Sequence, residues 1–396
     1  MTTLWGDLTW ELLESDFQAA YKTTARLGPG KLAEIKEESG GFTSQVVFVT
    51  LDWIGEAAAE LPGKAVLKIV SSQTLKDIKN LTVEGSTDDA ELDVPAMLNN
   101  NELNFYRHWH KWGLGDLPVV KFLAGRDVEA DSAIGYIALE YKEGMTARFL
   151  YNTIPEESFI QFLKVMARVH GVTLANQSFA SDFPSNVRKL LNSKYVTYAS
   201  TASHLEKVLE QYPEAAEKVN NMKEYAKIYS DYDREQAIRK KTCPIELLAH
   251  GDTSLANVLW QKHGENGLDL TALHDWQTCH VGNPFMDLSR LMALSLAPEL
   301  LQNRRNDYLH IYYDEFKTHA GEATPWKNGD EVVDAFEQIF PLEMVSVTSL
   351  LVPFVPLMLR TCPAAEKEAA KVELFEKLRG VIELCDEFIR KWNLTQ

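Results

Sequence analysis

His250-Gly251-Asp252-Thr253-Ser254-Leu255-Ala256-Asn257 is the most informative run of this chain, and His274-Asp275-Trp276-Gln277 follows it further along. Asp252 is a carboxylate that can accept the proton of an attacking hydroxyl. Asn257 offers a neutral oxygen and Asp275 an anionic one, and Mg²⁺ takes one or two protein oxygens of this kind beside phosphate oxygens and water. The two runs therefore contain the groups needed to deprotonate a hydroxyl and to hold magnesium on a nucleotide.

The segment between the two runs has the pattern of a β-hairpin. Val258-Leu259-Trp260 and Leu270-Thr271-Ala272-Leu273 are short apolar stretches on either side of Gly264-Glu265-Asn266-Gly267. Such stretches, separated by a turn that contains glycine, favour antiparallel pairing. The pairing would return Asp275 to the side of Asn257, so we expect one site built from both runs.

The first part of the chain carries a complementary set of residues. Ser39-Gly40-Gly41-Phe42-Thr43-Ser44 precedes an expected strand, and its backbone N–H groups and hydroxyls can donate to phosphate; a simple hairpin turn at the glycines is the alternative. Lys68 is the single cation in the apolar residues 65–70 and can reach phosphate oxygens. Glu102, in an expected helix, can pair with Lys68, and Glu91 is the rival partner. This division of labour is that of phosphoryl transfer in kinases.

Periodicity and breaker residues divide the chain into two parts. The first part is mixed, with strands expected at residues 42–51, 65–70, 119–122 and 134–141 and helices at residues 8–26 and 95–112. The second part is mainly helical, with helices expected from Pro155 onward and at residues 184–240, 285–318, 330–360 and 365–392, and with strand and loop at residues 246–276. The expected fold class is α+β, with a small mixed β-sheet lobe and a large mainly α-helical lobe.

Residues 344–359 form the longest strongly apolar run without charge. The run is shorter than the roughly 18 apolar residues expected of a membrane span. It contains Pro353 and Pro356, and proline interrupts helical hydrogen bonding. We therefore expect a buried helix with breaks and no membrane partner.

Composition narrows the classes of partner. The chain of 396 residues has a net charge of −17, which argues against a nucleic-acid or anionic-membrane surface, where basic patches are expected. The same charge is compatible with a cationic small substrate. The four cysteines form no CxxC spacing, and the first seven residues lack the basic and apolar regions of a signal peptide. We expect reduced thiols, no disulfide-linked partner and a cytoplasmic location.

The pattern His-Gly-Asp-x4-Asn, then His-Asp-Trp-Gln, then Gly282-Asn283-Pro284-Phe285-Met286-Asp287-Leu288 resembles the choline kinase and aminoglycoside phosphotransferase superfamily. Within it, the chain is most similar to the CHK kinase-like group, also called ecdysteroid kinase-like, and to its large nematode branch. Asn101-Glu102-Leu103-Asn104-Phe105-Tyr106 and the Gly-Gly-Phe-Thr-Ser run at residues 40–44 also resemble motifs of that group. The resemblance extends from about residue 8 to the last expected helix.

This resemblance implies a protein-kinase-like fold of two lobes with ATP in the cleft. Residues 1–140 would be the N-terminal nucleotide-binding lobe and residues 141–146 the hinge. Residues 147–396 would be the C-terminal helical lobe, with the catalytic loop and the substrate site. The strand that ends Ala138-Leu139-Glu140-Tyr141-Lys142 would bind adenine, through backbone groups of Glu140 and Lys142.

The resemblance also implies a role for each candidate residue. Asp252 would be the catalytic base, and Asn257 and Asp275 would be the magnesium ligands. Lys68 would contact phosphate, and Glu102 would be its partner. The glycine loop of residues 40–44 would cover the phosphates. Asp287 would brace the catalytic loop.

Two features favour a small molecule over a protein as the acceptor. Gly251 stands where protein kinases carry arginine, and glycine also permits a left-handed backbone there. In addition, no long activation segment separates Asp275 from Pro284. The expected reaction is therefore transfer of the γ-phosphate of ATP, with Mg²⁺, to a hydroxyl of a small organic molecule, either sterol-like, choline-like or a xenobiotic alcohol. That substrate would contact residues between 184 and 240 and after 340.

Several alternatives remain open. The chain can be a catalytically weak ligand-binding protein on the same scaffold. His250 can be a second base, although a structural hydrogen-bonding residue is the preferred interpretation, and His170 is expected to be a core histidine. Gly28-Pro29-Gly30 is interpreted as a loop, because we expect no strand before it, whereas a dinucleotide fingerprint follows a strand.

Overall fold

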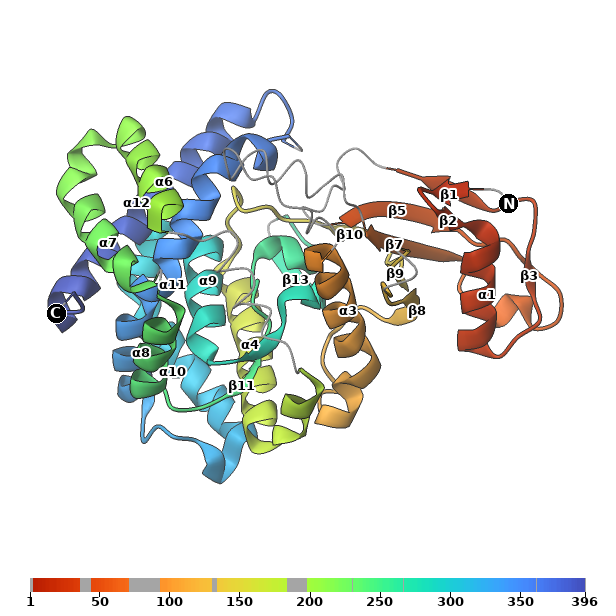
Figure 1. Ribbon diagram of the computed structural model, residues 1–396, viewed down its shortest axis with the longest axis horizontal. Coiled ribbons are helices and arrows are strands. Elements are labelled where there is room, and N and C mark those ends of the chain that lie inside the picture. The colour runs from red at the N-terminus through yellow and green to blue at the C-terminus, as the bar shows by residue number, and fades with distance from the viewer. Residues whose placement is uncertain are drawn as a thin grey trace. The chain divides into compact units, whose positions relative to one another are not determined.

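The structure is a computed structural model that describes residues 3–35, 44–70, 93–129, 134–183, 198–229, 231–265, 267–360 and 362–395. The chain forms two compact units (Figure 1). The first unit comprises Met1–Arg107 and Val119–Gly144, and the second comprises His108–Pro118 and Met145–Gln396. The first unit holds the larger sheet and the second most of the helices, which confirms the predicted α+β class with a small mixed part and a large helical part.

The first unit is built on a five-stranded antiparallel sheet. Its strands, in spatial order, are β4 (Leu32–Glu34), β5 (Ser44–Thr50), β7 (Lys64–Val70), β9 (Tyr136–Glu140) and β8 (Phe122–Arg126). In β7, Ala65, Leu67 and Ile69 are buried in the core. Because side chains alternate between the faces of a strand, Lys68 lies on the opposite face, together with Lys64. The register places Lys68 opposite Val46 of β5.

Two helices and several short strands complete the first unit. The helices are α1 (Trp10–Tyr21) and α3 (Asp93–His108), and the short elements are β1 (Thr3–Trp5), β2 (Leu8–Thr9), β3 (Arg26–Leu27), β6 (Trp53–Ile54) and the 3-10 turn η2 (Ala58–Glu60). Helix α1 is shorter than the expected span of residues 8–26, since Thr9 caps its start and Lys22 ends it in a left-handed conformation. The strand expected at residues 119–122 begins only at Phe122.

The second unit is mainly helical. Its described helices are α4 (Glu156–Ala175), α6 (Tyr198–Gln211), α7 (Ala216–Tyr229), α8 (Tyr232–Thr242), α9 (Pro284–Ser295), α10 (Pro298–Ala320), α11 (Gly329–Met358) and α12 (Lys367–Trp392). Its 3-10 turns include η3 (Trp109–Trp112), η4 (Gln177–Asp182), η5 (Pro213–Ala215) and η8 (Gly321–Ala323). Helix α4 buries Phe159, Phe162 and Met166, which confirms the predicted helical spacing. Phe159 meets Tyr308 of α10 edge to face.

Helix α11 corrects one prediction. The breaks expected at Pro353 and Pro356 are absent from its backbone, because the helix runs without interruption from Gly329 to Met358. A proline inside a helix destabilises the fold by roughly 3 kcal/mol. Burial of each large apolar side chain stabilises the fold by about 1.5–3 kcal/mol. Phe336, Phe340 and other side chains of α11 are fully buried, so packing outweighs the prolines. Among the described residues, none of the helices combines the length and the apolar character needed to cross a membrane.

Two small sheets of the second unit flank the predicted catalytic run. Strands β12 (Val258–His263) and β13 (Gly267–Leu273) form an antiparallel hairpin in which Val258 faces Leu273, which confirms the predicted pairing. Strand β10 (Met145–Thr146), within the expected hinge, pairs with β12. Strand β11 (Leu247–Ala249) pairs with β14 (His280–Gly282), a strand that the sequence did not predict.

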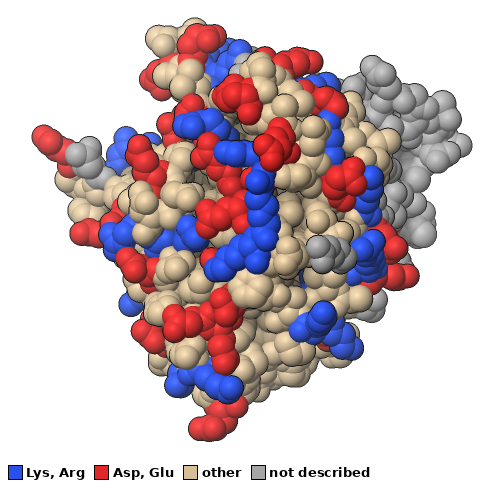
Figure 2. Space-filling view, turned by 90° about the vertical axis from the view of Figure 1, so that its left-hand side faces the viewer, with Lys and Arg blue, Asp and Glu red and all other residues tan. Residues whose placement is uncertain are grey.

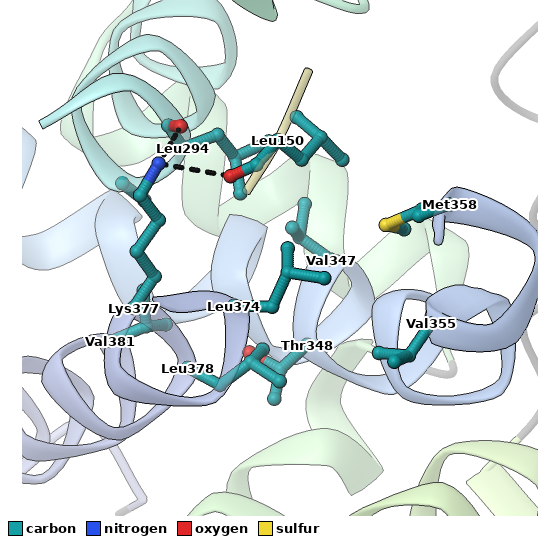
Figure 3. A pocket seen from close by; sticks show the side chains of 11 residues that line it. Leu150, Leu294, Val347, Thr348, Val355, Met358, Leu374, Lys377, Leu378 and Val381 are labelled. Carbon is teal, nitrogen blue, oxygen red and sulfur yellow. Dashed lines mark hydrogen bonds between the residues drawn. The ribbon is translucent and has the colours of Figure 1, made fainter. Parts of the chain in front are cut away.

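A buried lysine fixes the C-terminal end of α9. The Lys377 ammonium, on α12, donates to the carbonyls of Leu294 (2.9 Å) and Leu150 (2.9 Å) (Figure 3). It also donates to the carbonyl of Asn152 (2.5 Å). Its side chain borders an apolar cavity of about 10 Å³, and burial lowers the pKa of Lys377 to about 8. Since carbonyls at a helix end lack intrahelical partners, the contact with Leu294 ties α9 to the segment that follows β10.

Charged side chains of both signs cover the face shown in Figure 2. Basic and acidic residues are interspersed there, on the side of the molecule where α7 and α12 lie in Figure 1. Ion pairs between elements account for part of this pattern, as between Arg390 of α12 and Glu217 of α7 (2.8 Å). The excess of acidic residues in the composition is thus mixed with basic residues on this face.

Candidate active site

The loop from His250 to Asn257 connects β11 to the 3-10 turn η6 (Leu255–Asn257), which leads directly into β12. Gly251 adopts the left-handed backbone region, with φ +85°. A Cβ at this position would clash with the carbonyl oxygen of Thr278. Both constraints require glycine here, as the sequence predicted.

The buried carboxylate of Asp287 holds the backbone of this loop. Asp287 lies in the first turn of α9, which Asn283 caps by accepting from the Phe285 N–H. Its oxygens accept the N–H groups of His250 (2.7 Å) and Gly251 (2.9 Å). The side chain is fully buried, so it braces the loop from inside the unit, as the sequence predicted.

A histidine and a tyrosine support Asp287 from behind. His170 of α4 donates from Nε2 to Asp287 (3.0 Å), and its Nδ1 lies 2.9 Å from the hydroxyl of Tyr312. Burial raises the pKa of the Asp287 carboxyl, but the hydrogen bond and charge of His170, together with His250 and the N–H of Gly251, outweigh burial, and the net pKa is lowered. Burial raises the pKa of Tyr312 well above its ordinary value. His170 is thus a buried histidine with both ring nitrogens bonded, as predicted.

His250 joins the two predicted runs. Its Nδ1 accepts the N–H of Asp252 (3.3 Å), and its Nε2 donates to the carbonyl of His274 (3.2 Å). Its ring packs on Trp276, with a centroid separation of 4.4 Å. Because both nitrogens serve bonds within the site, the geometry favours the structural interpretation of His250 over a second base.

The Asp252 carboxylate has a partner at each oxygen. Oδ2 accepts from Nδ2 of Asn257 (3.1 Å), and Oδ1 accepts from Nη1 of Arg290 on α9 (3.1 Å). The Asp252 side chain is 37% exposed, so it remains open to a molecule from solvent. The carboxylate is therefore oriented by protein donors while it stays accessible, which is the arrangement a general base needs.

Arg290 was missed by the sequence analysis. Its Nε–H is buried and has no hydrogen-bond partner among the described residues. A buried donor without a partner destabilises the folded protein by about 1–3 kcal/mol. A partly exposed ion pair typically stabilises it by only about 0–1 kcal/mol. The pair with Asp252 is thus a poor source of stability. The signal that could have revealed it is the spacing from Asp287, since residues three apart share a helix face.

The hairpin returns the chain to Asn257 one residue before Asp275. The N–H of His274 donates to the carbonyl of Asn257 (3.0 Å), and Asp275 follows at once. Nδ2 of Asn257 donates to the carbonyl of Asp252 (2.7 Å) as well as to its carboxylate, which leaves Oδ1 of Asn257 as the acceptor atom. Asp275 has φ +65°, a conformation unusual for a residue with a side chain and often found at functional sites.

These two oxygens fit the requirements of magnesium. Mg²⁺ commonly takes one or two protein oxygens and completes its shell with phosphate oxygens and water. Asn257 and Asp275 would supply that number. A group of three or more His, Cys, Asp or Glu side chains able to hold a metal does not occur among the described residues, so the fit rests on this pair.

In the first unit, the structure brings Lys68 and Glu102 together. Nζ of Lys68, on β7, lies 2.5 Å from Oε2 of Glu102, on α3. The two side chains are 12% and 1% exposed, so Glu102 is buried and the ammonium is held at the sheet. The rival partner Glu91 lies outside the described residues.

The other predicted nucleotide contacts lie partly outside the described residues. Gly40, Gly41, Phe42 and Thr43 fall there, whereas Ser44 begins β5. Glu140 ends β9, and its N–H donates to the carbonyl of Lys121 (2.9 Å). The predicted contact of Glu140 with adenine is thereby restricted to its carbonyl.

Tyr141 and Lys142 follow β9 directly. The ring of Tyr141 meets Phe48 of β5 edge to face, and Nζ of Lys64 lies 5.3 Å from the centroid of the Tyr141 ring. Lys142 pairs with the carboxylate of Glu140 (3.3 Å). The side chains of this segment are therefore engaged within the first unit, and its backbone stays the candidate for nucleotide contact.

The Gly28-Pro29-Gly30 segment also differs from expectation. The two-residue strand β3 precedes it, so the stated reason for rejecting a dinucleotide fingerprint was wrong. The segment leads into strand β4 and not into a helix, whereas the fingerprint needs a helix N-terminus for the pyrophosphate. Asp52 instead holds the turn, since it accepts the N–H of Gly30 at 2.7 Å.

Two curated relatives from Caenorhabditis elegans match this chain. "Uncharacterized oxidoreductase dhs-27" is 21% identical over 350 residues, which cover 84% of this chain and 40% of that protein. "Uncharacterized kinase-like protein D1044.1" is 21% identical over 294 residues, which cover 72% of this chain and 74% of that protein. This chain thus spans about 40% of the length of the first relative, whose name describes a longer protein.

Solved structures of small-molecule kinases are also similar. A putative aminoglycoside phosphotransferase from Ralstonia eutropha has a TM-score of 0.50 at 14% identity and covers 96% of this chain and 98% of its own. Choline kinase from Cryptosporidium parvum has a TM-score of 0.49 at 13% identity, covering 91% and 93%. At these identities the likeness concerns the fold alone, and the first of the two establishes that this chain has a kinase-like fold.

A family model matches nearly the whole chain. It carries the description "DUF1679: Uncharacterized oxidoreductase dhs-27", and the match extends over residues 4–390. The match includes both units and every candidate site residue described above. The chain therefore belongs to the DUF1679 family.

Proposed function

We propose that this protein is a kinase that uses ATP and Mg²⁺ to phosphorylate a hydroxyl of a small organic molecule. The observation that carries the proposal is the Asp252 carboxylate, which is accessible to solvent and fixed by Asn257 and Arg290. Its loop is braced by the buried Asp287, and the hairpin that pairs Val258 with Leu273 supports a site shared by Asn257 and Asp275. The kinase-like fold supports the same assignment.

In this proposal Asp252 is the general base. The acceptor oxygen forms a bond to the γ-phosphorus while the bond to the bridging oxygen breaks, ADP leaves with that electron pair, and the hydroxyl proton passes to Asp252. Mg²⁺ held by Asn257 and Asp275 would neutralise phosphate charge. Lys68, oriented by Glu102, would bind phosphate oxygens.

We assign nucleotide binding to the first unit on the same grounds. Residues 40–44 would cover the phosphates. The carbonyl of Glu140 and the backbone groups of Tyr141 and Lys142 would bind adenine. The substrate class we propose is a sterol-like, choline-like or xenobiotic alcohol, as in the ecdysteroid kinase-like group, acting in the cytoplasm without a nucleic-acid or membrane partner.

The alternative is a catalytically weak ligand-binding protein on the same scaffold. A thermal-shift titration tests nucleotide binding first: a binder at 100 times its dissociation constant gains about 2.7 kcal/mol of stability. An unfolding temperature that does not change on addition of ATP and Mg²⁺ would contradict the kinase proposal. A shift without turnover would favour the alternative.

A screen for turnover then tests the chemistry. The protein, ATP and Mg²⁺ are incubated with a metabolite extract, and mass spectrometry searches for a species that gains one phosphate. Asp252→Asn should abolish that gain while it keeps the thermal shift. Asp269→Asn is the matched control, because Asp269 lies on β13 and is half exposed beside His263. Retained transfer in Asp252→Asn would remove Asp252 as the base.

A further inference from the structure

Helix α9 carries two charged residues, and both are directed at the same loop. The helix reads Pro-Phe-Met-Asp-Leu-Ser-Arg-Leu-Met-Ala-Leu-Ser, with Asp287 and Arg290 as its charged members. Asp287 accepts from the loop backbone at His250 and Gly251, whereas Arg290 donates to the side chain of Asp252. One helix face thus fixes both the backbone of the loop and its carboxylate.

We propose that Arg290 is a positioning residue that holds the Asp252 carboxylate in the orientation required to accept the hydroxyl proton. This inference rests on the proposed kinase function and adds a residue to it. Nη1 of Arg290 lies 3.1 Å from Oδ1 of Asp252, and Nδ2 of Asn257 lies 3.1 Å from Oδ2, so one donor on each oxygen fixes the orientation of the carboxylate. Arg290 also sets a positive charge beside a carboxylate that must work near anionic phosphates.

Two observations argue against a purely structural role. The Nε–H of Arg290 is buried without a partner among the described residues, so the arginine lies here at a cost to stability. Apart from Asp287 and the two serines, the rest of α9 is apolar, and every residue of the helix except Arg290 is buried, so a methionine would suit the helix better. A residue that is unfavourable for folding and touches the base is typical of a site selected for activity.

The test compares Arg290→Met, which keeps the aliphatic stem, with Arg290→Lys, which restores a cation. The probe is Asp252-dependent release of inorganic phosphate from ATP and Mg²⁺, with water as acceptor, measured beside thermal unfolding. We expect Arg290→Met to lower kcat about 10- to 100-fold, the range expected when a reacting group is misplaced. KM for MgATP should change by less than about twofold. The Tm should hold or rise, and Arg290→Lys should recover part of kcat.

Arg168→Met is the matched control. Arg168 of α4 pairs with Asp116 at 3.3 Å and is 31% exposed, so it tests the loss of a comparable ion pair away from the loop, and its kcat should match the wild type. Unchanged kcat in Arg290→Met would overturn the inference. A lowered kcat accompanied by a lowered Tm would also overturn it, because unfolding would then explain the loss of activity. If the wild type releases no Asp252-dependent phosphate, the proposed function itself fails and the inference fails with it.

Discussion

Gly251 and Thr278 are in direct backbone contact across the two halves of the site. The carbonyl of Thr278 occupies the space that a Cβ of residue 251 would need. The hydroxyl of Thr278 donates to the carbonyl of His250 at 3.2 Å. The loop before Asp252 is thus clamped to the turn after Asp275, and the clamp requires a residue without a side chain.

Gly251→Ala should therefore weaken both stability and activity. A left-handed backbone costs an L-residue roughly 1–2 kcal/mol, and the clash with Thr278 adds displacement of the loop. Gly264→Ala is the control, because Gly264 has φ +60° but nothing within 4 Å of an added Cβ. Denaturant unfolding should show a larger loss for Gly251→Ala. Equal losses would show that the contact with Thr278 does not matter.

Asp287→Asn should destabilise the second unit by about 3 kcal/mol or more, since it leaves buried donors facing an amide. The lowered pKa of Asp287 means that its contribution is present above the unfolded value near 4 and is lost as pH falls below it. The free energy of unfolding of the wild type should thus approach that of Asp287→Asn in acid. Asp116→Asn, whose side chain is 90% exposed, should show little change at any pH.

Lys377 should impose a pH dependence of the same sign, but in the alkaline range. Its pKa is lowered to about 8 in the folded protein, so the unfolded chain binds more protons between pH 8 and the ordinary value near 10.4. The free energy of unfolding should therefore rise with pH across that window. Lys377→Met should lack this rise, whereas Lys367→Met, at the exposed start of α12, should keep it. Parallel profiles for the wild type and Lys377→Met would contradict the assignment.

Lys68→Met should weaken nucleotide binding by the first unit. Loss of the ammonium removes a phosphate contact, and we expect the Kd for MgATP to rise by at least about tenfold, as for the loss of one charge-assisted hydrogen bond. Lys64→Met is the control on the same strand and face, where Lys64 is half exposed and pairs with Glu143. Isothermal titration measures both variants. Similar Kd values for the two would exclude Lys68 from the phosphate site.

The sequence predicted the parts of the site that depend on local pattern. The pairing of residues 258–260 with residues 270–273 follows from two short apolar stretches on either side of a turn with glycine. That pairing is the basis for expecting Asp275 near Asn257. Gly251 and Asp287 were recognised because their motif implies a tight loop and a brace. Lys68 was recognised as the single cation in the apolar residues 65–70, and Glu102 was paired with it as an acidic residue of the helix that follows.

The rest depended on tertiary structure. Arg290 looks like an ordinary helix residue until α9 packs beneath the loop. Strand β14 is only three residues long, too short for a periodic pattern. Pro353 and Pro356 signal a break locally, yet the burial of α11 overrides them.

The route of the chain has a practical consequence. The backbone passes between the two units three times, after Arg107, Pro118 and Gly144. A fragment that begins at Met145 would lack the segment His108–Pro118, from which Trp112 donates its indole N–H to Asp182 (2.8 Å) and the Pro118 carbonyl accepts from Leu273 (2.6 Å). No single cut yields an intact helical unit, so expression of the separate units requires a split at all three junctions.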